Sequence, residues 1–430
     1  MSGILEISSG IIERIEKTAG NLKDRSVYID IKDRLLFISL FTGLLKCGSK
    51  IVMMPVEIMP EDYYFDGGIF ITDNKEDTRA FVTDKNYNLV SEPVNQINKI
   101  DVIDKYDLYF FTSGSSGKPK LVGKSYENFI TEVKELKRIF TSEKGMKIFV
   151  TPPLYHIYGF LFGMLLPASS GAVLYTDFVF TPESIAEFVN TNKIDFFAST
   201  PSYYDYFRKL DLSSCFVNTG FMASSSGPLS LETSGYFYNH GCLITEVYGS
   251  TETGGIATRV AHRNMRWKFF SYVDTVNNIP EDMDDGITSL KIRSDAISVD
   301  YDQECGYDTG DIYILYEDGF ELAGRNSRFV KIAGKRLDLE FVVNKFALVF
   351  EEIYSLKPDN TDIAVIEDSG RVYLGFEKRV SDEINCHYLK EELKKHLPGY
   401  AVPRVIKECI IPRNSMGKID RKKMEEILTK

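Results

Sequence analysis

Short runs of β-branched and aromatic residues alternate with segments of helical spacing along most of the chain. The runs at 147–153 and 194–200 predict buried strands. Segments 125–140 and 181–190 repeat apolar residues at helical intervals, which predicts amphipathic helices. This alternation predicts an α/β fold with layered elements and a largely parallel sheet.

The pattern changes after about residue 324. The elements expected there are a helix at 339–353, strands at 362–368 and 371–379, and a helix at 386–397. We therefore expect two domains, a large N-terminal layered α/β domain at residues 1–324 and a small mobile C-terminal α+β domain at 325–430. The small part carries 21 Lys+Arg and 17 Asp+Glu. This balance suits a phosphorylated ligand or an acidic partner, and equally an ordinary charged surface.

Composition excludes several classes of protein. The net charge of −11 over 430 residues argues against nucleic acid as a main partner. Six cysteines stand singly with no CxxC pair, which indicates reduced thiols rather than a disulfide framework or a zinc site. The N-terminus lacks the basic and apolar blocks of a signal peptide. The most apolar window, 160–175, is interrupted by Pro167 and two glycines, so we expect no membrane span and a cytoplasmic protein.

A loop rich in glycine and hydroxyl residues follows the apolar run at 107–111. The sequence from Thr112 to Lys120 is TSGSSGKPK. Backbone N–H groups, hydroxyls and two lysines suit an anion, and glycine lets the backbone approach it closely. The stretch departs from the Walker pattern GxxxxGK[ST], so by itself it fits a phosphate-binding loop or a plain flexible loop.

Further stretches follow this loop in a definite order. They are TEVYGSTETG at 245–254, GYDTGD at 306–311, GRNSRFVKIAGKRLDLE at 324–340 and PRNSMGKIDR at 412–421. In this order and at these distances they resemble the adenylate-forming superfamily, which includes acyl-CoA synthetases, aryl ligases, peptide-synthetase adenylation domains and luciferases. The stretches LLKCGSKIVMMP at 44–55 and LPGYAVP at 397–403 resemble two further elements of that family. The resemblance covers nearly the whole chain.

The resemblance implies a two-step reaction. A carboxylate attacks the α-phosphorus of ATP and expels pyrophosphate, and the acyl-adenylate then reacts with a thiol. The implied cofactors are ATP, Mg²⁺ and either coenzyme A or phosphopantetheine. The implied partners are a small-molecule carboxylic acid and an acyl carrier protein.

The same resemblance assigns roles to individual residues. Phosphate contacts fall to Thr112, Ser113, Gly114, Ser115, Ser116, Gly117, Lys118 and Lys120. Tyr248 would lie against the adenine, with Ser226 and Gly227 along its other edge. Asp311 would accept hydrogen bonds from the ribose hydroxyls, and Arg325 would lie by the ribose and the hinge. Glu246 and Gly249 are further nucleotide-binding candidates. The catalytic candidates are Thr251 at the α-phosphate, Glu252 as the Mg²⁺ ligand, Lys418 for adenylation and Lys331 for thiol attack. Taken singly, each also fits an ordinary structural role, such as a core aromatic, a turn residue or a solvated charge.

The stretch PPLYHIYGFLFG at 152–163 resembles the family element that lines the acid pocket. His156, Tyr158 and Phe162 would face the substrate there, with core packing as the alternative. No acidic residue stands in this element to pair with an α-ammonium group. We therefore favour an aryl or fatty acid over an amino acid, and stretches such as STETGGIATR resemble ligases that load such acids onto carrier proteins.

Some positions depart from the family pattern. The chain before residue 44 is several tens of residues shorter than usual, Tyr126 replaces a customary histidine, and Ser327 stands at the hinge where Asp or Lys is usual. Two alternatives to a thioester-forming ligase remain open. One is a nucleotide-binding pseudoenzyme with a regulatory role, and the other is an adenylating enzyme that transfers the acyl group to an amine.

Overall fold

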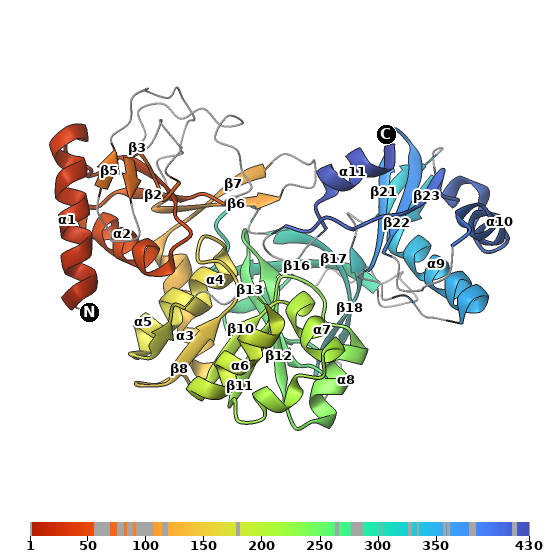
Figure 1. Ribbon diagram of the computed structural model, residues 1–430, viewed down its shortest axis with the longest axis horizontal. Helices are drawn as coiled ribbons and strands as arrows, with labels where there is room; N and C mark the ends of the chain where they lie inside the picture. Colours follow the sequence, from red (N-terminus) through yellow and green to blue (C-terminus); the bar gives the residue numbers. More distant parts are fainter. Residues whose placement is uncertain are drawn as a thin grey trace. The chain divides into compact units, whose positions relative to one another are not determined.

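The chain folds into two compact units (Figure 1). The first comprises residues 1–114, 118–276 and 292–307, and the second comprises 115–117, 277–291 and 308–430. The computed structural model describes all residues except 1, 56–68, 75–80, 84–88, 92–105, 114–118, 178–180, 263–265, 277–286, 300, 303, 326–328, 333–334, 356–357, 359–361, 378–383, 415–418 and 430.

A seven-stranded sheet, called here the first sheet, opens the first unit. Its strands are β1 (Ser26–Asp30), β2 (Lys50–Met53), β3 (Ile69–Thr72), β4 (Phe81–Thr83), β5 (Leu89–Ser91), β6 (Leu108–Ser113) and β7 (Pro119–Lys124). Their order is β5-β4-β3-β1-β2-β6-β7. The pairs from β4 to β6 are parallel, whereas β6 and β7 form an antiparallel hairpin.

Two helices accompany this sheet. Helix α1 (Ser2–Ala19) lies along α2 (Arg34–Cys47) (Figure 1). Helix α2 begins where the Asp33 carboxylate accepts a hydrogen bond from the Leu36 N–H at 2.8 Å, and it ends at Gly48 in the left-handed conformation.

A second seven-stranded sheet follows. Its strands are β8 (Lys147–Val150), β9 (Val173–Tyr175), β10 (Phe196–Ser199), β11 (Phe221–Ser224), β12 (Ile244–Ser250), β13 (Gly254–Val260) and β14 (Lys268–Phe269), in the order β14-β13-β12-β11-β10-β8-β9. The pairs from β9 to β12 are parallel, and β12 turns back antiparallel into β13.

Helix α3 (Tyr126–Ile139) lies between the two sheets and contacts both. Its Phe129 ring lies 5.9 Å from Phe110 of β6, and Phe140 at its C-terminal end lies 5.0 Å from Phe196 of β10. Ser125 and Asn128 cap the helix reciprocally. The same helical layer continues through α4 (Ile157–Phe160), a π-helical turn at Leu161–Leu165 and α5 (Leu166–Ser170).

The opposite face of the second sheet is covered by α6 (Pro182–Asn192), α7 (Pro201–Lys209) and α8 (Leu231–Asn239). Their apolar side chains pack on one core of buried strand residues, which includes Phe149, Phe197, Met222 and Ile244. A short 3-10 helix (Ser213–Phe216) adds to it. The first unit therefore has layers of sheet, helix, sheet and helix. Beyond these layers, β15 (Val273–Thr275) pairs antiparallel with the end of β16 (Ile287–Ser294).

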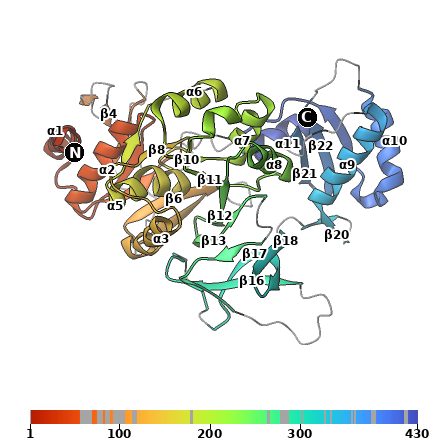
Figure 2. The ribbon, with the colours of Figure 1, turned by 90° about the horizontal axis from the view of Figure 1, so that it is seen from below.

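The longest segment of the second unit, 308–430, contains most of the antiparallel hairpin of β17 (Tyr307–Tyr316) and β18 (Gly319–Arg325). The remaining elements are β19 (Phe329–Ile332), β20 (Lys335–Asp338), α9 (Leu339–Tyr354), β21 (Ile363–Asp368), β22 (Arg371–Phe376), α10 (Cys386–His396), a 3-10 turn (Gly399–Ala401), β23 (Val405–Glu408) and α11 (Arg421–Thr429). Alternate residues of β21 and β22 face two separate cores, one with α9 and α10 and the other with α11 (Figure 2).

The elements predicted from the hydrophobic pattern are confirmed at all eight places. The four in the first unit are α3, α6, β8 and β10, and the four in the second are α9, α10, β21 and β22. The compact units have no single boundary, because the second comprises 115–117 and 277–291 as well as 308–430, which includes the β17–β18 hairpin from Asp308 onwards. The apolar window 160–175 is divided among α4, the π-helical turn, α5 and β9, and no described helix is long and apolar enough to cross a membrane.

Candidate active site

A tight turn joins β12 to β13 and carries Thr251 and Glu252. Residues on either side hold it closed: the Ser250 N–H donates to Thr253 Oγ1 at 3.0 Å, and the Thr253 N–H donates to Ser250 Oγ at 3.2 Å. The Thr253 hydroxyl is buried and also donates to the Gly254 carbonyl at 2.9 Å. Thr251 and Glu252 remain partly exposed at the tip of this fixed turn.

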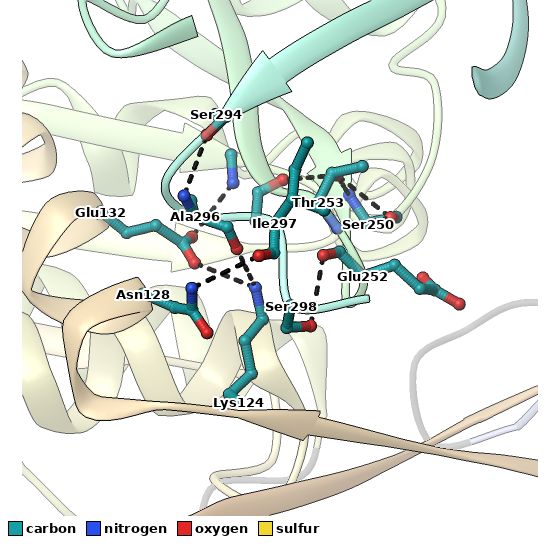
Figure 3. A network of polar contacts seen from close by, with 12 residues as sticks. Lys124, Asn128, Glu132, Ser250, Glu252, Thr253, Ser294, Ala296, Ile297 and Ser298 are labelled. Atoms are coloured by element: carbon teal, nitrogen blue, oxygen red, sulfur yellow. Dashed lines mark hydrogen bonds and ion pairs between the residues drawn. The ribbon is translucent and has the colours of Figure 1, made fainter. Parts of the chain in front are cut away.

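The backbone and the side chain of Glu252 have different environments. Its carbonyl oxygen accepts hydrogen bonds from the Ser298 N–H at 3.0 Å and the Ser298 hydroxyl at 3.3 Å. Its carboxylate points away from the surrounding polar network, as Figure 3 shows. Within the described part of the chain, no hydrogen bond or ion pair engages that carboxylate.

This carboxylate fits a Mg²⁺ ion held together with a nucleotide. Mg²⁺ prefers oxygen ligands and is usually bound by one or two carboxylates, with phosphates and waters completing its shell. Across the described residues no cluster of three or more His, Cys, Asp or Glu could form an all-protein metal cage. A single accessible carboxylate on a fixed turn is therefore the type of ligand that such a site requires.

Behind the turn lies a buried ion pair. Lys124, at the end of β7, and Glu132, on α3, are 0% and 1% exposed. Lys124 Nζ donates to the Ala296 carbonyl at 2.8 Å and lies 3.5 Å from Glu132 Oε1 (Figure 3). Glu132 Oε2 accepts a hydrogen bond from the Gly255 N–H at 3.0 Å, whereas Oε1 has only the longer ion-pair contact.

The opposite charges of Lys124 and Glu132 act against the pKa shifts that burial causes in both groups. Burial lowers the pKa of Lys124, and the carboxylates of Glu132 and then Glu252 act against that shift. Burial likewise raises the pKa of Glu132, and the Lys124 ammonium is the main opposing influence. Gly254 lets the turn approach the Glu132 carboxylate closely. Its φ is +69°, and a Cβ at this position would lie 2.5 Å from Glu132 Oε1.

Asn128 attaches a further segment to the same helix. Its Nδ2 donates to the Asp295 carbonyl at 2.7 Å and to the Ile297 carbonyl at 3.4 Å. The segment 294–298 is thus bonded to α3 on one side, and to the Glu252 turn through Ser298 on the other (Figure 3).

The three residues expected around the adenine, and the nucleotide-binding candidate Gly249, lie on β12 and the nearby segment after β11. Tyr248 is partly exposed, with its ring 5.6 Å from Trp267. Ser226 has φ +76° and is half-buried, while Gly227 and Gly249 are exposed. These four positions are therefore accessible at the carboxyl ends of β11 and β12, two neighbouring strands of the second sheet.

Glu246 has a different position from the one expected. It is 3% exposed, and both of its oxygens are occupied by protein donors. Oε1 accepts from the Leu229 N–H at 3.2 Å, and Oε2 accepts from Arg259 Nε at 2.6 Å. The assignment of Glu246 to the nucleotide is therefore wrong for this structure, in which Glu246 fixes the segment at Leu229 against β12.

The phosphate-loop prediction falls partly on the β6–β7 hairpin. Thr112 pairs with Lys120 across the hairpin, and its hydroxyl lies 3.3 Å from the Lys120 carbonyl, to which it donates. Ser113 faces Pro119 in the same register, and the Lys120 side chain is exposed. The other expected phosphate contacts lie outside the described residues; they are Gly114, Ser115, Ser116, Gly117 and Lys118.

Two of the three expected acid-pocket residues lie in the core. Tyr158 is 5% exposed, and its hydroxyl lies 3.1 Å from the Ser199 carbonyl and 3.0 Å from the Ala223 carbonyl. Phe162 is 1% exposed and packs 5.6 Å from Phe140. The structure corrects the expectation that these side chains face the substrate, because both are enclosed by protein.

His156 remains a candidate contact for the acid. It is partly buried just before α4, with its ring 4.7 Å from Tyr155. Gly159 explains the spacing of this element, since a Cβ there would lie 2.0 Å from the Pro153 carbonyl oxygen. Only glycine therefore lets α4 start so close to the preceding proline turn.

The second unit carries the remaining candidates. Asp311 on β17 is 7% exposed, its N–H donates to Thr309 Oγ1 at 3.1 Å, and it pairs in register with Arg325 of β18. Lys331 lies on β19 opposite Arg336 of β20. Ser327, the residue expected at the hinge, and the catalytic candidate Lys418 lie outside the described residues.

Sequence reasoning missed the buried Lys124–Glu132 pair and Asn128. A signal for Glu132 was present, because it falls on the apolar face of the predicted helix at 125–140, between Phe129 and Leu136. A carboxylate on such a face requires a buried partner. No comparable pattern in the sequence indicates that this partner is Lys124.

The chain was compared with known protein families and structures. Residues 69–276, which include the turn and most of both sheets, match the family model described as AMP-binding enzyme. The chain carries an AMP-binding domain. Together with the similar ligases below, this match supports the adenylate-forming superfamily.

Several ligases are similar over about three quarters of the chain. The 2-succinylbenzoate–CoA ligase of Listeria monocytogenes is 25% identical, over 74% of this chain and 69% of its own length. The 3,4-dihydroxybenzoate–[aryl-carrier protein] ligase of Bacillus anthracis is 23% identical, over 73% and 72%. The mitochondrial malonate–CoA ligase of Homo sapiens is 24% identical over 74% of this chain, which spans 65% of that longer enzyme.

Two solved structures share the fold. The ATP-bound MatB of Rhodopseudomonas palustris has a TM-score of 0.74 at 15% identity and covers 98% of this chain and 92% of its own. The O-succinylbenzoate coenzyme A synthetase of Bacillus subtilis, in complex with ATP and magnesium ion, has a TM-score of 0.74 at 16% identity, covering 98% and 93%. The predicted α/β fold of the adenylate-forming type is confirmed.

Proposed function

We propose that this chain is an AMP-forming acid–thiol ligase. It activates a small carboxylic acid with ATP and passes the acyl group from the adenylate to a thiol. The observation that carries the proposal is the Glu252 carboxylate, which has no hydrogen-bond or ion-pair partner among the described residues and stands on a hydrogen-bonded turn inside the AMP-binding domain. The similar proteins include ligases for coenzyme A and for an aryl-carrier protein.

The residues divide the task as follows. Glu252 would hold Mg²⁺, which when bound neutralises phosphate charge, and Thr251 would contact the α-phosphate. Tyr248 and the segment Ser226–Gly227 would enclose the adenine. The hairpin residues Thr112 and Lys120, with the loop between them, would contact the other phosphates.

The second unit supplies the remaining roles. Asp311 would accept hydrogen bonds from the ribose hydroxyls, because a carboxylate accepts without donating, and Arg325 would lie nearby. Lys418 would neutralise the charge that develops during adenylation, and Lys331 would serve the thiol step. A swing of the small C-terminal domain about Ser327 would exchange these two lysines at the site.

The substrate class is an aryl or fatty acid, with His156 as the candidate side chain next to it. The thiol is that of coenzyme A or of the phosphopantetheine arm of a carrier protein. A cytoplasmic location belongs to the same proposal, and it is supported by cysteines that are all free thiols.

Acid-dependent exchange of pyrophosphate into ATP, measured over a panel of aryl, fatty and dicarboxylic acids, tests the first half-reaction. Thioester formation with coenzyme A and with a holo carrier protein, using the best acid, tests the second. Binding of MgATP without exchange for any acid would identify a pseudoenzyme instead. Exchange without thioester, but with amide formation from an added amine, would identify an amine acceptor.

A further inference from the structure

We infer that Lys124 and Glu132 are positioning residues of the metal–nucleotide site, holding the turn that presents Glu252. Neither residue belongs to the motifs that suggested the site. This inference rests on the proposed function, because it gives these buried residues a purpose in binding MgATP.

The first step is the attachment of the turn to α3. Glu132 Oε2 accepts a hydrogen bond from the Gly255 N–H, three residues after Glu252. The Glu132 side chain is 1% exposed, so this bond lies in a dry environment where it is strong and where its loss is costly. The C-terminal side of the turn is therefore fixed to the helix between the two sheets.

The second step is the attachment of the segment 294–298. Lys124 Nζ donates to the Ala296 carbonyl at 2.8 Å, and Ser298 then donates twice to the Glu252 carbonyl. The backbone of Glu252 is thus bonded to a segment that Lys124 anchors from below (Figure 3). With both sides of the turn secured, the carboxylate is directed outwards.

The third step is the position of Lys124 in the chain. It ends β7, and β7 leads directly from the loop predicted to contact the phosphates. One buried side chain therefore connects the strand that follows that loop to the segment that supports the metal ligand. The attraction between Lys124 and Glu252, which acts against the effect of burial on the pKa of Lys124, agrees with this proximity.

A purely structural ion pair would behave differently. Replacing both partners of a buried pair by apolar side chains is often neutral for stability, whereas removing one partner leaves an uncompensated buried charge and is strongly destabilising. A double replacement therefore separates a contribution to folding from a contribution to the site.

The experiment uses the full chain and four variants. These are Lys124→Met, Glu132→Gln, the double variant Lys124→Met/Glu132→Leu and the control Lys134→Met. The control removes an exposed lysine from α3, the helix that carries Glu132. Isothermal titration calorimetry with ATP at a series of MgCl₂ concentrations gives the half-saturating Mg²⁺ concentration. Urea unfolding of each variant gives its stability.

We expect the double variant to regain most of the stability that Lys124→Met loses. Its half-saturating Mg²⁺ concentration should nevertheless stay about 10- to 100-fold above that of the unmodified chain, the range for residues that orient metal ligands. Glu132→Gln leaves the buried Lys124 ammonium without its carboxylate partner, so it should lose stability. It retains an acceptor for the Gly255 N–H, so its half-saturating Mg²⁺ concentration should rise less than that of the double variant. Lys134→Met should match the unmodified chain in both measurements.

A double variant with an unchanged Mg²⁺ titration would overturn the inference and leave the proposed function intact. An unmodified chain that binds no ATP at any Mg²⁺ concentration would overturn the proposed function, and the inference with it. Because calorimetry needs no acid substrate, neither result depends on identifying the acid.

Discussion

Substituting Tyr158 by phenylalanine separates a core role from a substrate role. The change removes one buried hydroxyl and leaves the ring in place. That hydroxyl has a single proton, which it shares between the carbonyls of Ser199 and Ala223. Ala223 also accepts from the Tyr204 hydroxyl at 2.9 Å, so only Ser199 loses its side-chain donor. We expect the free energy of unfolding to fall by about 1–2 kcal/mol, because one hydrogen bond is lost and the Ser199 carbonyl loses a donor in an apolar environment.

Urea unfolding followed by tyrosine fluorescence and far-UV circular dichroism measures this loss. Tyr204→Phe should cost a similar amount, and the double variant Tyr158→Phe/Tyr204→Phe should cost more than the sum, because Ala223 then has neither donor. Tyr206→Phe, at a side chain 44% exposed, is the control and should be neutral. If Tyr158→Phe leaves stability unchanged but raises the KM for the acid tenfold, the side chain contacts the substrate and our placement of it is refuted.

Three further substitutions test the proposed chemistry. Lys418→Ala should lower the rate of pyrophosphate exchange by on the order of 10²–10³ with folding intact, because one directed charge is lost; a rate within a few-fold of the unmodified chain contradicts this role. Glu252→Gln keeps the shape of the side chain and removes its charge, so the Mg²⁺ requirement should rise and ATP turnover should fall. An unchanged Mg²⁺ titration would show that Glu252 has only a structural role. Ser327→Pro fixes φ near −65°, so it should impair one half-reaction and spare the other; parallel losses of exchange and thioester yield would count against alternating poses.

Much of the fold follows from local pattern. Helix α3 begins where Ser125 can cap it and buries Phe129, Val133 and Leu136 at helical intervals. The short 3-10 and π-helical turns were not predicted, since their ends depend on packing rather than on period. The β17–β18 hairpin, which falls in the second compact unit from Asp308 onwards, has no distinctive boundary in sequence.

The candidate site was predicted less completely. Motif order selected Thr251 and Glu252, and the structure places both on the turn between β12 and β13. It could not show that the Glu246 carboxylate is already bonded to Arg259. It also could not show that Tyr158 and Phe162 face the core. These two residues are four positions apart and therefore lie on one helical face. Lys124 illustrates the difficulty most clearly, because lysine is rarely buried and its carbonyl partner lies 172 residues away.

The long separation between Lys124 and Ala296 has a consequence for synthesis of the chain. A ribosome delivers the N-terminal part first, so a nascent chain that ends before residue 292 already contains both sheets. In that intermediate Lys124 and Asn128 lack the carbonyls that they bond in the finished protein. Residues 69–276, the stretch that matches the family model, therefore lack the carbonyl partners of Lys124 and Asn128. Completion of the first unit waits until the segment 292–307 has emerged and closed over the buried lysine.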